Sequence, residues 1–90
     1  YGAAGRANTL LNYCGISTQY LDYIVDESPS RQDRFTPGTN IPIVKPSKKD
    51  LKADYILILA WNYQEQIVEK CRKSGYKGEL IIPLPKVEVV

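Results

Sequence analysis

The sequence predicts an α/β domain with three layers and a mostly parallel sheet. Segments of helical periodicity alternate with short apolar runs along the chain, which is typical of a sheet covered by helices on both faces. The strongest run, residues 55–60, is apolar without alternation, as expected for a parallel strand buried on both sides. We therefore expect the elements along the chain in this order: turn-helix, strand, loop, strand, helix, strand, helix, strand.

The composition predicts one small globular domain. The chain has 90 residues, of which 43% are hydrophobic and 24% are charged. A net charge of +2 is too small to indicate a nucleic-acid partner. No run in the sequence approaches the roughly 20 apolar residues that a membrane span requires, so we expect no membrane partner. A cytoplasmic location is expected.

The absence of histidine limits the chemistry that the chain can perform. With no histidine and two separated cysteines, a zinc site is not expected, and neither is a histidine-activated nucleophile. Cys14 and Cys71 each fall on the apolar stripe of an expected helix. Both are therefore interpreted as buried thiols.

The first half of the chain predicts one helix and two strands. The helix is expected at residues 6–14, where apolar residues recur on one face before Gly15 ends it, and the first strand at residues 21–25. A long loop, residues 27–40, is interpreted as functional because it carries two arginines and a phenylalanine. The second strand, residues 41–44, contains Pro42, which favours a sheet edge.

The second half predicts two helices around two strands. Ser47 and Asp50 form a capping-box pattern for a brief helix with Leu51 facing inward. After the strand at residues 55–60, Asn62 and Glu65 predict the cap of a helix that runs to about residue 74 and ends at a glycine. A last strand is expected at residues 79–82, and residues 86–90 could add an extended segment.

The first residues of the chain are unusually small and lead straight into the first helix. Small side chains there let a ligand approach the backbone, and the N–H groups of a helix start bind anions. The Gly-x-Gly-x-x-Gly spacing is kept by Gly2, Ala4 and Ala7, with Gly5 as an extra glycine. The alternative is a tight turn between strand and helix that binds nothing. A strand should precede this turn, and only Tyr1 stands there. We expect a fragment trimmed at its N-terminus; the alternative is an opening strand supplied from elsewhere.

Asp26 strengthens the interpretation of this turn as a dinucleotide-type, Rossmann-like site. It lies about twenty residues beyond the turn, at the expected end of a strand, where an acid can accept hydrogen bonds from a ribose. Trp61 and Asn62 follow another strand at the same expected edge. The plainer alternatives are a turn-capping carboxylate for Asp26, a core side chain for Trp61 and a helix cap for Asn62.

Five stretches occur in this order along the sequence: YGAAGRANTLLNYCGI (1–16), YIVD (23–26), RFTPGT with IPI (34–39 and 41–43), DYILILAWN (54–62) and IPLP (82–85). In these stretches the sequence resembles the C-terminal domain of SAM-dependent C-methyltransferases that act on nucleotide-activated deoxysugars. The resemblance covers essentially the whole chain. The sequence departs from the family pattern where Ala7 replaces a further glycine, and the strand before Tyr1 is missing.

The resemblance implies a parent protein with three domains. These are an N-terminal zinc-binding domain, a central SAM-binding domain, and this single Rossmann-like domain, which would help to hold the nucleotide part of the substrate. SAM and zinc are accordingly expected in the other domains and no cofactor in this one. Methyl transfer to carbon needs a base and a methyl donor site, and these residues offer neither. This domain alone is not expected to methylate anything.

The leading hypothesis is therefore a domain that binds a nucleotide-activated sugar and contacts the SAM-binding domain of its own chain. One alternative is a structural docking domain without ligand, with an apolar patch around Phe35 and Trp61. The other is a free-standing NAD- or CoA-binding domain. The candidate substrate-binding residues are Gly2, Ala4, Gly5, Arg6, Ala7, Asn8, Asp26, Arg34, Phe35, Trp61 and Asn62.

Overall fold

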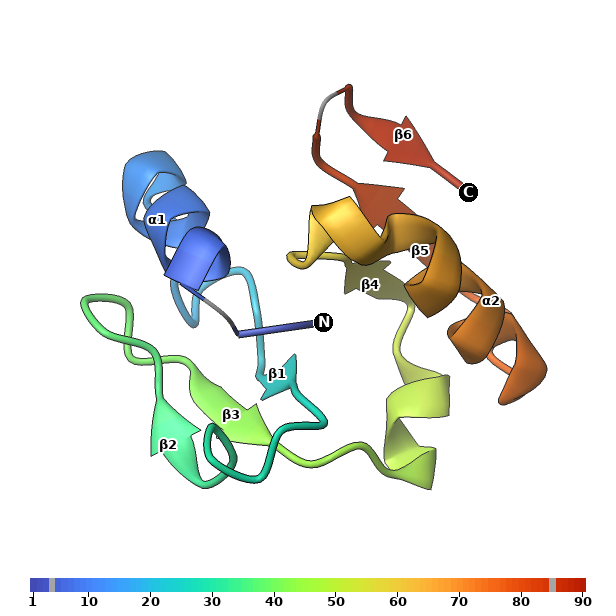
Figure 1. Ribbon diagram of the computed structural model, residues 1–90, viewed down its shortest axis with the longest axis horizontal. Coiled ribbons are helices and arrows are strands. Elements are labelled where there is room, and N and C mark those ends of the chain that lie inside the picture. The colour runs from blue at the N-terminus through green and yellow to red at the C-terminus, as the bar shows by residue number, and fades with distance from the viewer. Residues whose placement is uncertain (4, 85) are drawn as a thin grey trace. The chain divides into compact units, whose positions relative to one another are not determined.

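The computed structural model describes residues 1–3, 5–84 and 86–90 and divides into two compact units, Tyr1–Pro46 and Ser47–Val90 (Figure 1). Each unit contains a three-stranded sheet with one parallel and one antiparallel pair of strands. The predicted α/β class is thus confirmed, but the two sheets are mixed, not mostly parallel. A three-layer Rossmann-like arrangement stays a prediction.

The first unit combines one helix with a sheet of strand order β1-β3-β2. β1 and β3 are parallel, with Ile24 opposite Ile43, and β2 and β3 are antiparallel. The predicted helix and two of these strands are confirmed. The elements are α1 (Gly5–Cys14), β1 (Ile24–Val25), β2 (Arg34–Phe35) and β3 (Pro42–Val44).

α1 turns Ala7 and Leu11 into the core and ends as predicted at a left-handed glycine. Gly15 has a φ of 67°, and the Ile16 N–H donates to the Leu11 carbonyl at 2.9 Å. The prediction that Cys14 is buried is wrong, because it lies in the last turn of α1, where the helix no longer buries its apolar stripe. Cys14 is therefore an exposed thiol.

Pro42 lies in the central strand of its sheet, so the predicted edge position is wrong. It is the first residue of β3, before the parallel register with β1 begins. On the β2 side, the ladder uses the carbonyls of Ile41 and Ile43. A proline is tolerated there because its missing N–H is not needed by either neighbour.

Residues 27–40, predicted to be a loop, contain the additional strand β2. β2 and β3 form a hairpin in which the Ile41 N–H donates to the buried Thr36 Oγ1 at 2.9 Å. Asn12 of α1 holds this hairpin by donating to the Pro37 carbonyl at 3.2 Å. Gly38, with a φ of 81°, leaves no room for a Cβ beside the Asn12 side chain.

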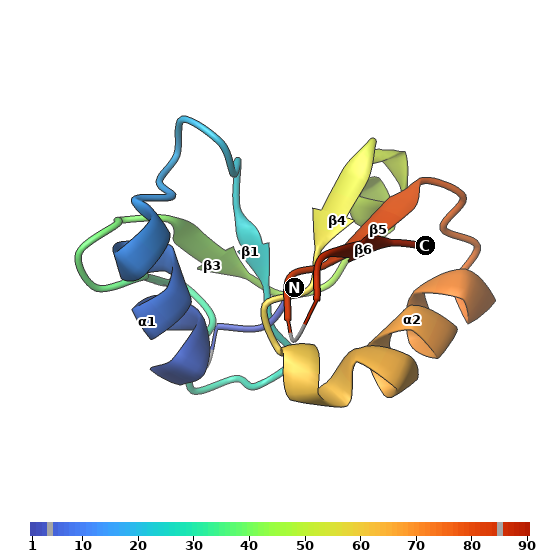
Figure 2. The same cartoon turned by 90° about the horizontal axis from the view of Figure 1, so that it is seen from above.

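The second unit has the strand order β4-β5-β6, and α2 lies along one face of this sheet (Figure 2). β4 and β5 are parallel, as predicted. β6 confirms the extended segment expected near the end of the chain. The elements are η1 (Lys48–Lys52), β4 (Tyr55–Leu57), η2 (Trp61–Tyr63), α2 (Gln64–Lys73), β5 (Glu79–Ile82) and β6 (Glu88–Val89).

Three predictions for the second unit are wrong in detail. β4 is not buried on both faces, because Tyr55 is 63% exposed and the fully buried residues are Ile58 and Leu59, just beyond the strand. Leu51 is exposed, since the short η1 is a 3₁₀ helix that buries no residue, although the Ser47–Asp50 capping box does form. Asn62 is no cap, because η2 precedes α2 and Asn62 falls inside it.

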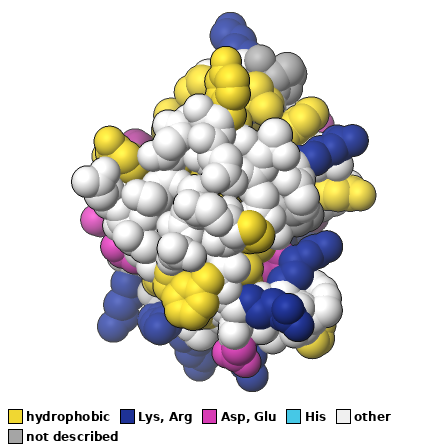
Figure 3. All heavy atoms as spheres, turned by 90° about the vertical axis from the view of Figure 1, so that its left-hand side faces the viewer, with side chains coloured by type: hydrophobic (Ala, Val, Ile, Leu, Met, Phe, Trp, Pro, Cys, Tyr) yellow, Lys and Arg dark blue, Asp and Glu magenta, His cyan; other side chains and the backbone are white. Residues whose placement is uncertain are grey.

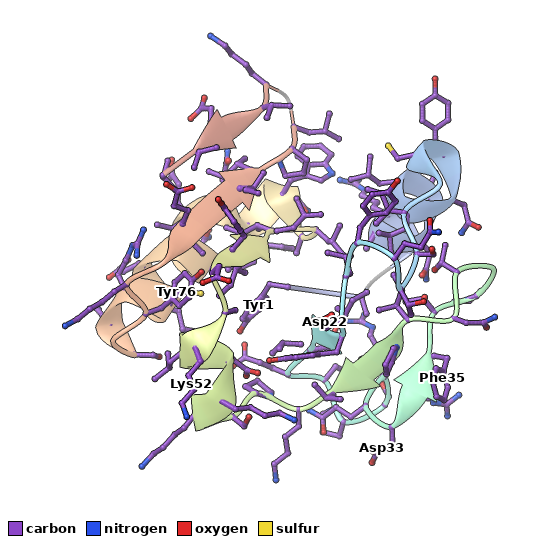
Figure 4. The ribbon with its side chains drawn as sticks, turned by 180° about the vertical axis from the view of Figure 1, so that it is seen from behind. Tyr1, Asp22, Asp33, Phe35, Lys52 and Tyr76 are labelled. Atoms are coloured by element: carbon purple, nitrogen blue, oxygen red, sulfur yellow. The ribbon has the colours of Figure 1, made fainter. Side chains whose placement is uncertain are left out.

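Tyr76 joins the end of α2 to β5 and is buried (Figure 4). Its hydroxyl donates to the Glu79 carbonyl at 3.2 Å, and the Arg72 guanidinium lies 5.7 Å from its ring centre. Arg72 also donates to the Tyr76 and Gly78 carbonyls at 2.9 and 2.8 Å. Burial raises the pKa of the Tyr76 phenol above its ordinary value of 10.0, because the phenolate loses solvation, and nearby Arg72 opposes this only in part.

The raised pKa of Tyr76 predicts a loss of stability in alkali. The folded state holds the phenolic proton more tightly than the unfolded state. Its contribution is therefore complete below the unfolded pKa and is lost as the pH rises through the folded pKa. Tyr76→Phe should remove this component and cost about 1 kcal/mol at pH 7. Urea unfolding at several pH values tests this against Tyr63→Phe, an exposed control, and an unchanged alkaline slope in Tyr76→Phe would contradict it.

Candidate functional site

The small-residue turn and the acid predicted from the sequence meet at the end of β1. The Gly2 N–H donates to the Val25 carbonyl at 2.8 Å, so the chain before α1 runs beside β1. One residue later, the Ala3 N–H donates to Asp26 Oδ2, also at 2.8 Å. Asp26 is 5% exposed, and its carboxylate holds the turn at the end of β1.

Asp26 has further partners in the loop that follows it. Its Oδ1 accepts from the Ser28 N–H at 2.8 Å, and Arg31 Nη1 lies 3.5 Å from Oδ2. The Gln32 side chain donates to the Asp26 main-chain carbonyl at 2.8 Å. A carboxylate offers about four acceptor positions, so most of the capacity of Asp26 is used within the protein. This arrangement corresponds closely to the turn-capping alternative considered for Asp26.

Arg31, one of the two arginines of the 27–40 loop, lies at this site but was not among the candidate binding residues. Its side chain is 46% exposed and reaches the carboxylate that also holds the Ala3 N–H. A guanidinium has five N–H donors, and the ion pair with Asp26 occupies only part of them. The available signal was the position of Arg31 in the loop directly after the acid.

The first turn of α1 contains no acidic residue of its own, whereas the first turn of α2 contains Glu65. The nearest described carboxylate contact is that of Asp26 with the Ala3 N–H, two residues before the helix. The N–H groups of the first four helical residues have no partner within a helix, and the helix dipole is positive there. In α1 these residues include Gly5, Ala7 and Asn8.

Gly5 is small although the protein itself has room for a larger side chain. A Cβ built there meets no heavy atom within 4 Å, and Gly5 does not have a positive φ. Since helical Cβ atoms point toward the N-terminus, this space lies in front of the turn. Neither backbone strain nor packing therefore explains the glycine.

The other α1 candidates differ in what they can offer. Ala7 is 2% exposed, so its side chain belongs to the core and only its N–H is available. Asn8 is half-buried, and its Oδ1 is buried without a hydrogen-bond partner among the described residues. Arg6 is exposed. Ala4, also predicted to contact the phosphates, lies outside the described residues.

Arg34 and Phe35 lie on a strand that is not adjacent to β1. This strand is β2, and β3 lies between β2 and β1. The backbone of Arg34 is therefore about 10 Å from that of β1. Phe35 is 64% exposed at the outer strand (Figure 4). On the face shown in Figure 3, polar and backbone atoms interrupt the hydrophobic side chains. Trp61, half-buried, and Asn62, exposed, belong to the second unit.

The described residues contain no group of three or more acidic or cysteine side chains arranged to hold a metal ion. Within the same residues, no helix has both the length and the apolar character required to traverse a bilayer. The first unit offers the N–H groups at the start of α1, and the Arg31 guanidinium lies 3.5 Å from the carboxylate that holds the Ala3 N–H.

Comparison with known proteins gives two matches. Residues 1–85 match the family model described as the C-methyltransferase C-terminal domain. The chain is also 33% identical over 92 residues to C-methyltransferase NovU of Streptomyces niveus. That match covers 100% of this chain and 22% of NovU, so the chain spans about a fifth of its relative.

Proposed function

Because the chain belongs to the C-methyltransferase C-terminal domain family, we propose that it holds the diphosphate of a nucleotide-activated sugar for methylation elsewhere in a longer protein. The observation that carries this proposal is the turn before α1. There, the Ala3–Asp26 hydrogen bond fixes the backbone, the first turn of α1 contains no acidic residue of its own, and a Cβ at Gly5 would meet no protein atom within 4 Å.

The ligand is proposed to lie with its diphosphate in front of the first turn of α1. Backbone N–H groups at Gly5, Arg6, Ala7 and Asn8 would donate to the phosphate oxygens, and Arg31 would add a cation. Asp26 would hold the turn and Arg31 in position and retains little capacity for a ribose hydroxyl. The geometry favours Arg31 over Arg34 for the phosphate contact.

The reaction itself is assigned to other parts of the longer protein. Proton removal beside a carbonyl and methyl transfer need a base and a donor site, and SAM and zinc are proposed to be held by other domains. The SAM-binding domain is the expected partner within the same chain. A cytoplasmic location suits a nucleotide-sugar substrate.

Two alternatives make different predictions. A docking domain without ligand would show no saturable nucleotide binding. An NAD- or CoA-binding domain would bind those cofactors more tightly than a nucleotide sugar. The family match favours the sugar, because it links the chain to a C-methyltransferase.

Calorimetric titration separates these possibilities. Thymidine diphosphate or uridine diphosphate sugars should bind saturably, whereas the sugar 1-phosphate, NADH and coenzyme A should bind at least tenfold more weakly. Equal or tighter binding of NADH would replace the proposal with the cofactor alternative. If no nucleotide produced a heat of binding, the docking domain without ligand would be the only remaining alternative.

A matched pair of arginines tests the assignment of the cation. Arg31→Gln should weaken binding of the diphosphate sugar about five- to tenfold, because a charge-assisted contact at a half-exposed site is lost. Arg34→Gln, on the exposed strand β2, should change the dissociation constant less than about twofold. The reverse order in calorimetry would move the phosphate site toward β2.

A further inference from the structure

The loop that carries Arg31 is tied to the sheet at both of its ends. At the start of the loop, the Asp26 N–H donates to the Val44 carbonyl at 3.0 Å. At its end, the Asp33 N–H donates to the Ile43 carbonyl at 2.9 Å. Val44 and Ile43 both belong to β3, the central strand of the sheet. Backbone hydrogen bonds alone therefore close this loop, which we call the arginine loop.

One side chain makes a further tie across the arginine loop. Gln32 is half-buried, and its Nε2 donates to the Asp26 main-chain carbonyl at 2.8 Å. The neighbouring Arg31 donates its own N–H to the Ser28 carbonyl at 3.0 Å. Because the backbone already attaches the loop to the sheet, the Gln32 contact is not needed for that attachment. Its effect falls on the segment beside it, which carries Arg31.

Arg31 shares its partner with the turn before α1. The Ala3 N–H and Arg31 Nη1 contact the same oxygen atom, Asp26 Oδ2, at 2.8 and 3.5 Å. A long, half-exposed side chain such as that of Arg31 loses conformational freedom when it contacts a ligand, and this loss lowers the affinity. A main chain that is fixed before the ligand arrives reduces the loss, because only the side chain then has to be ordered.

We propose that Gln32 is a positioning residue for the phosphate site, because its hydrogen bond to the Asp26 carbonyl holds Arg31 ready to contact a diphosphate. This inference rests on the proposed function, since it requires Arg31 to bind the ligand. Gln32 acts through Arg31 and is not assigned a contact with the ligand.

Hydrogen–deuterium exchange of the full-length protein without ligand tests whether Gln32 holds the loop. Gln32→Met keeps the length of the side chain and removes its N–H donor. In this variant, the peptide that contains Ser28 and Arg31 should exchange about threefold faster or more, as measured by mass spectrometry. Gln19→Met, at an exposed glutamine of the same unit, is the matched control and should leave this exchange unchanged. Unchanged exchange in Gln32→Met would overturn the proposal.

A double-mutant cycle with Arg31 separates a positioning role from a merely structural one. In calorimetric titration with thymidine diphosphate, Gln32→Met alone should weaken binding about threefold. In the Arg31→Gln background, the same substitution should change the dissociation constant by less than about 1.5-fold, because the side chain that it positions is gone. An equal loss of affinity in both backgrounds, or no loss in either, would overturn the proposal.

The two measurements also distinguish failure of this inference from failure of the proposed function. If the wild-type protein bound thymidine diphosphate and Gln32→Met bound it equally well, only the positioning role would be lost. If the wild-type protein bound no thymidine diphosphate although Gln32→Met exchanged faster, the phosphate site itself would be wrong. Gln32 would then stabilise the arginine loop without a role in binding.

Discussion

Asp26→Ala is expected to lower the free energy of unfolding of the first unit by about 3 kcal/mol, as measured by urea denaturation. The carboxylate is 5% exposed and accepts hydrogen bonds from the Ala3 and Ser28 N–H groups at 2.8 Å. Alanine would leave both donors without their acceptor and Arg31 without its partner. Loss of a buried charged acceptor costs more than loss of an exposed one.

Asp22→Ala is the control for this prediction, because Asp22 is exposed four residues earlier on the same segment. Its effect should stay within about 0.5 kcal/mol. Asp26→Asn should fall between the two, since an amide oxygen can still accept one of the hydrogen bonds. Equal stabilities of Asp26→Ala and Asp22→Ala would show that Asp26 does not hold the turn.

Gly5→Val is expected to weaken binding of a nucleotide diphosphate sugar at least tenfold, or about 1.4 kcal/mol. Its side chain would enter the space in front of the first turn of α1, where no heavy atom of the protein lies within 4 Å of a Cβ. The free energy of unfolding should change by less than about 1 kcal/mol, because valine replaces a glycine at a helix start without a packing clash. Gly5→Val should therefore lower the affinity for the ligand without a matching loss of stability.

Thr9→Val is the control for Gly5→Val. Thr9 is exposed one turn further along α1, so the substitution should leave the dissociation constant within twofold. Calorimetry and urea unfolding of both variants complete the comparison. If Gly5→Val binds the sugar nucleotide as tightly as the wild-type protein, the ligand does not occupy this space.

The parts of the fold that follow from local chemistry were predictable from the sequence. Gly15 and Gly75 end their helices with positive φ values, as the glycine pattern indicated. The run that contains β4 does pair in parallel with β5. The contact between Asp26 and the turn was also predictable, because Asp26 directly follows a strand and the turn was expected at the same edge of the sheet.

The predictions that failed depended on neighbours that the sequence does not identify. Whether Pro42 lies at an edge depends on β2, a pair of residues too short to show any periodicity. Cys14 shares the helical face of Leu11 but lies beyond the part of α1 that is packed. Arg31 acquires its partner only through the turn of the loop after Asp26, which no spacing rule encodes.

The most direct test of the phosphate site is an amide chemical-shift titration of the labelled domain with a thymidine diphosphate sugar. We expect saturable shifts at Gly5, Arg6, Ala7 and Asn8, together with the Arg31 side chain, and loss of these shifts in Gly5→Val. Shifts confined to residues outside the turn and the start of α1, or no saturable shift at any ligand concentration, would show that the diphosphate does not bind at this turn.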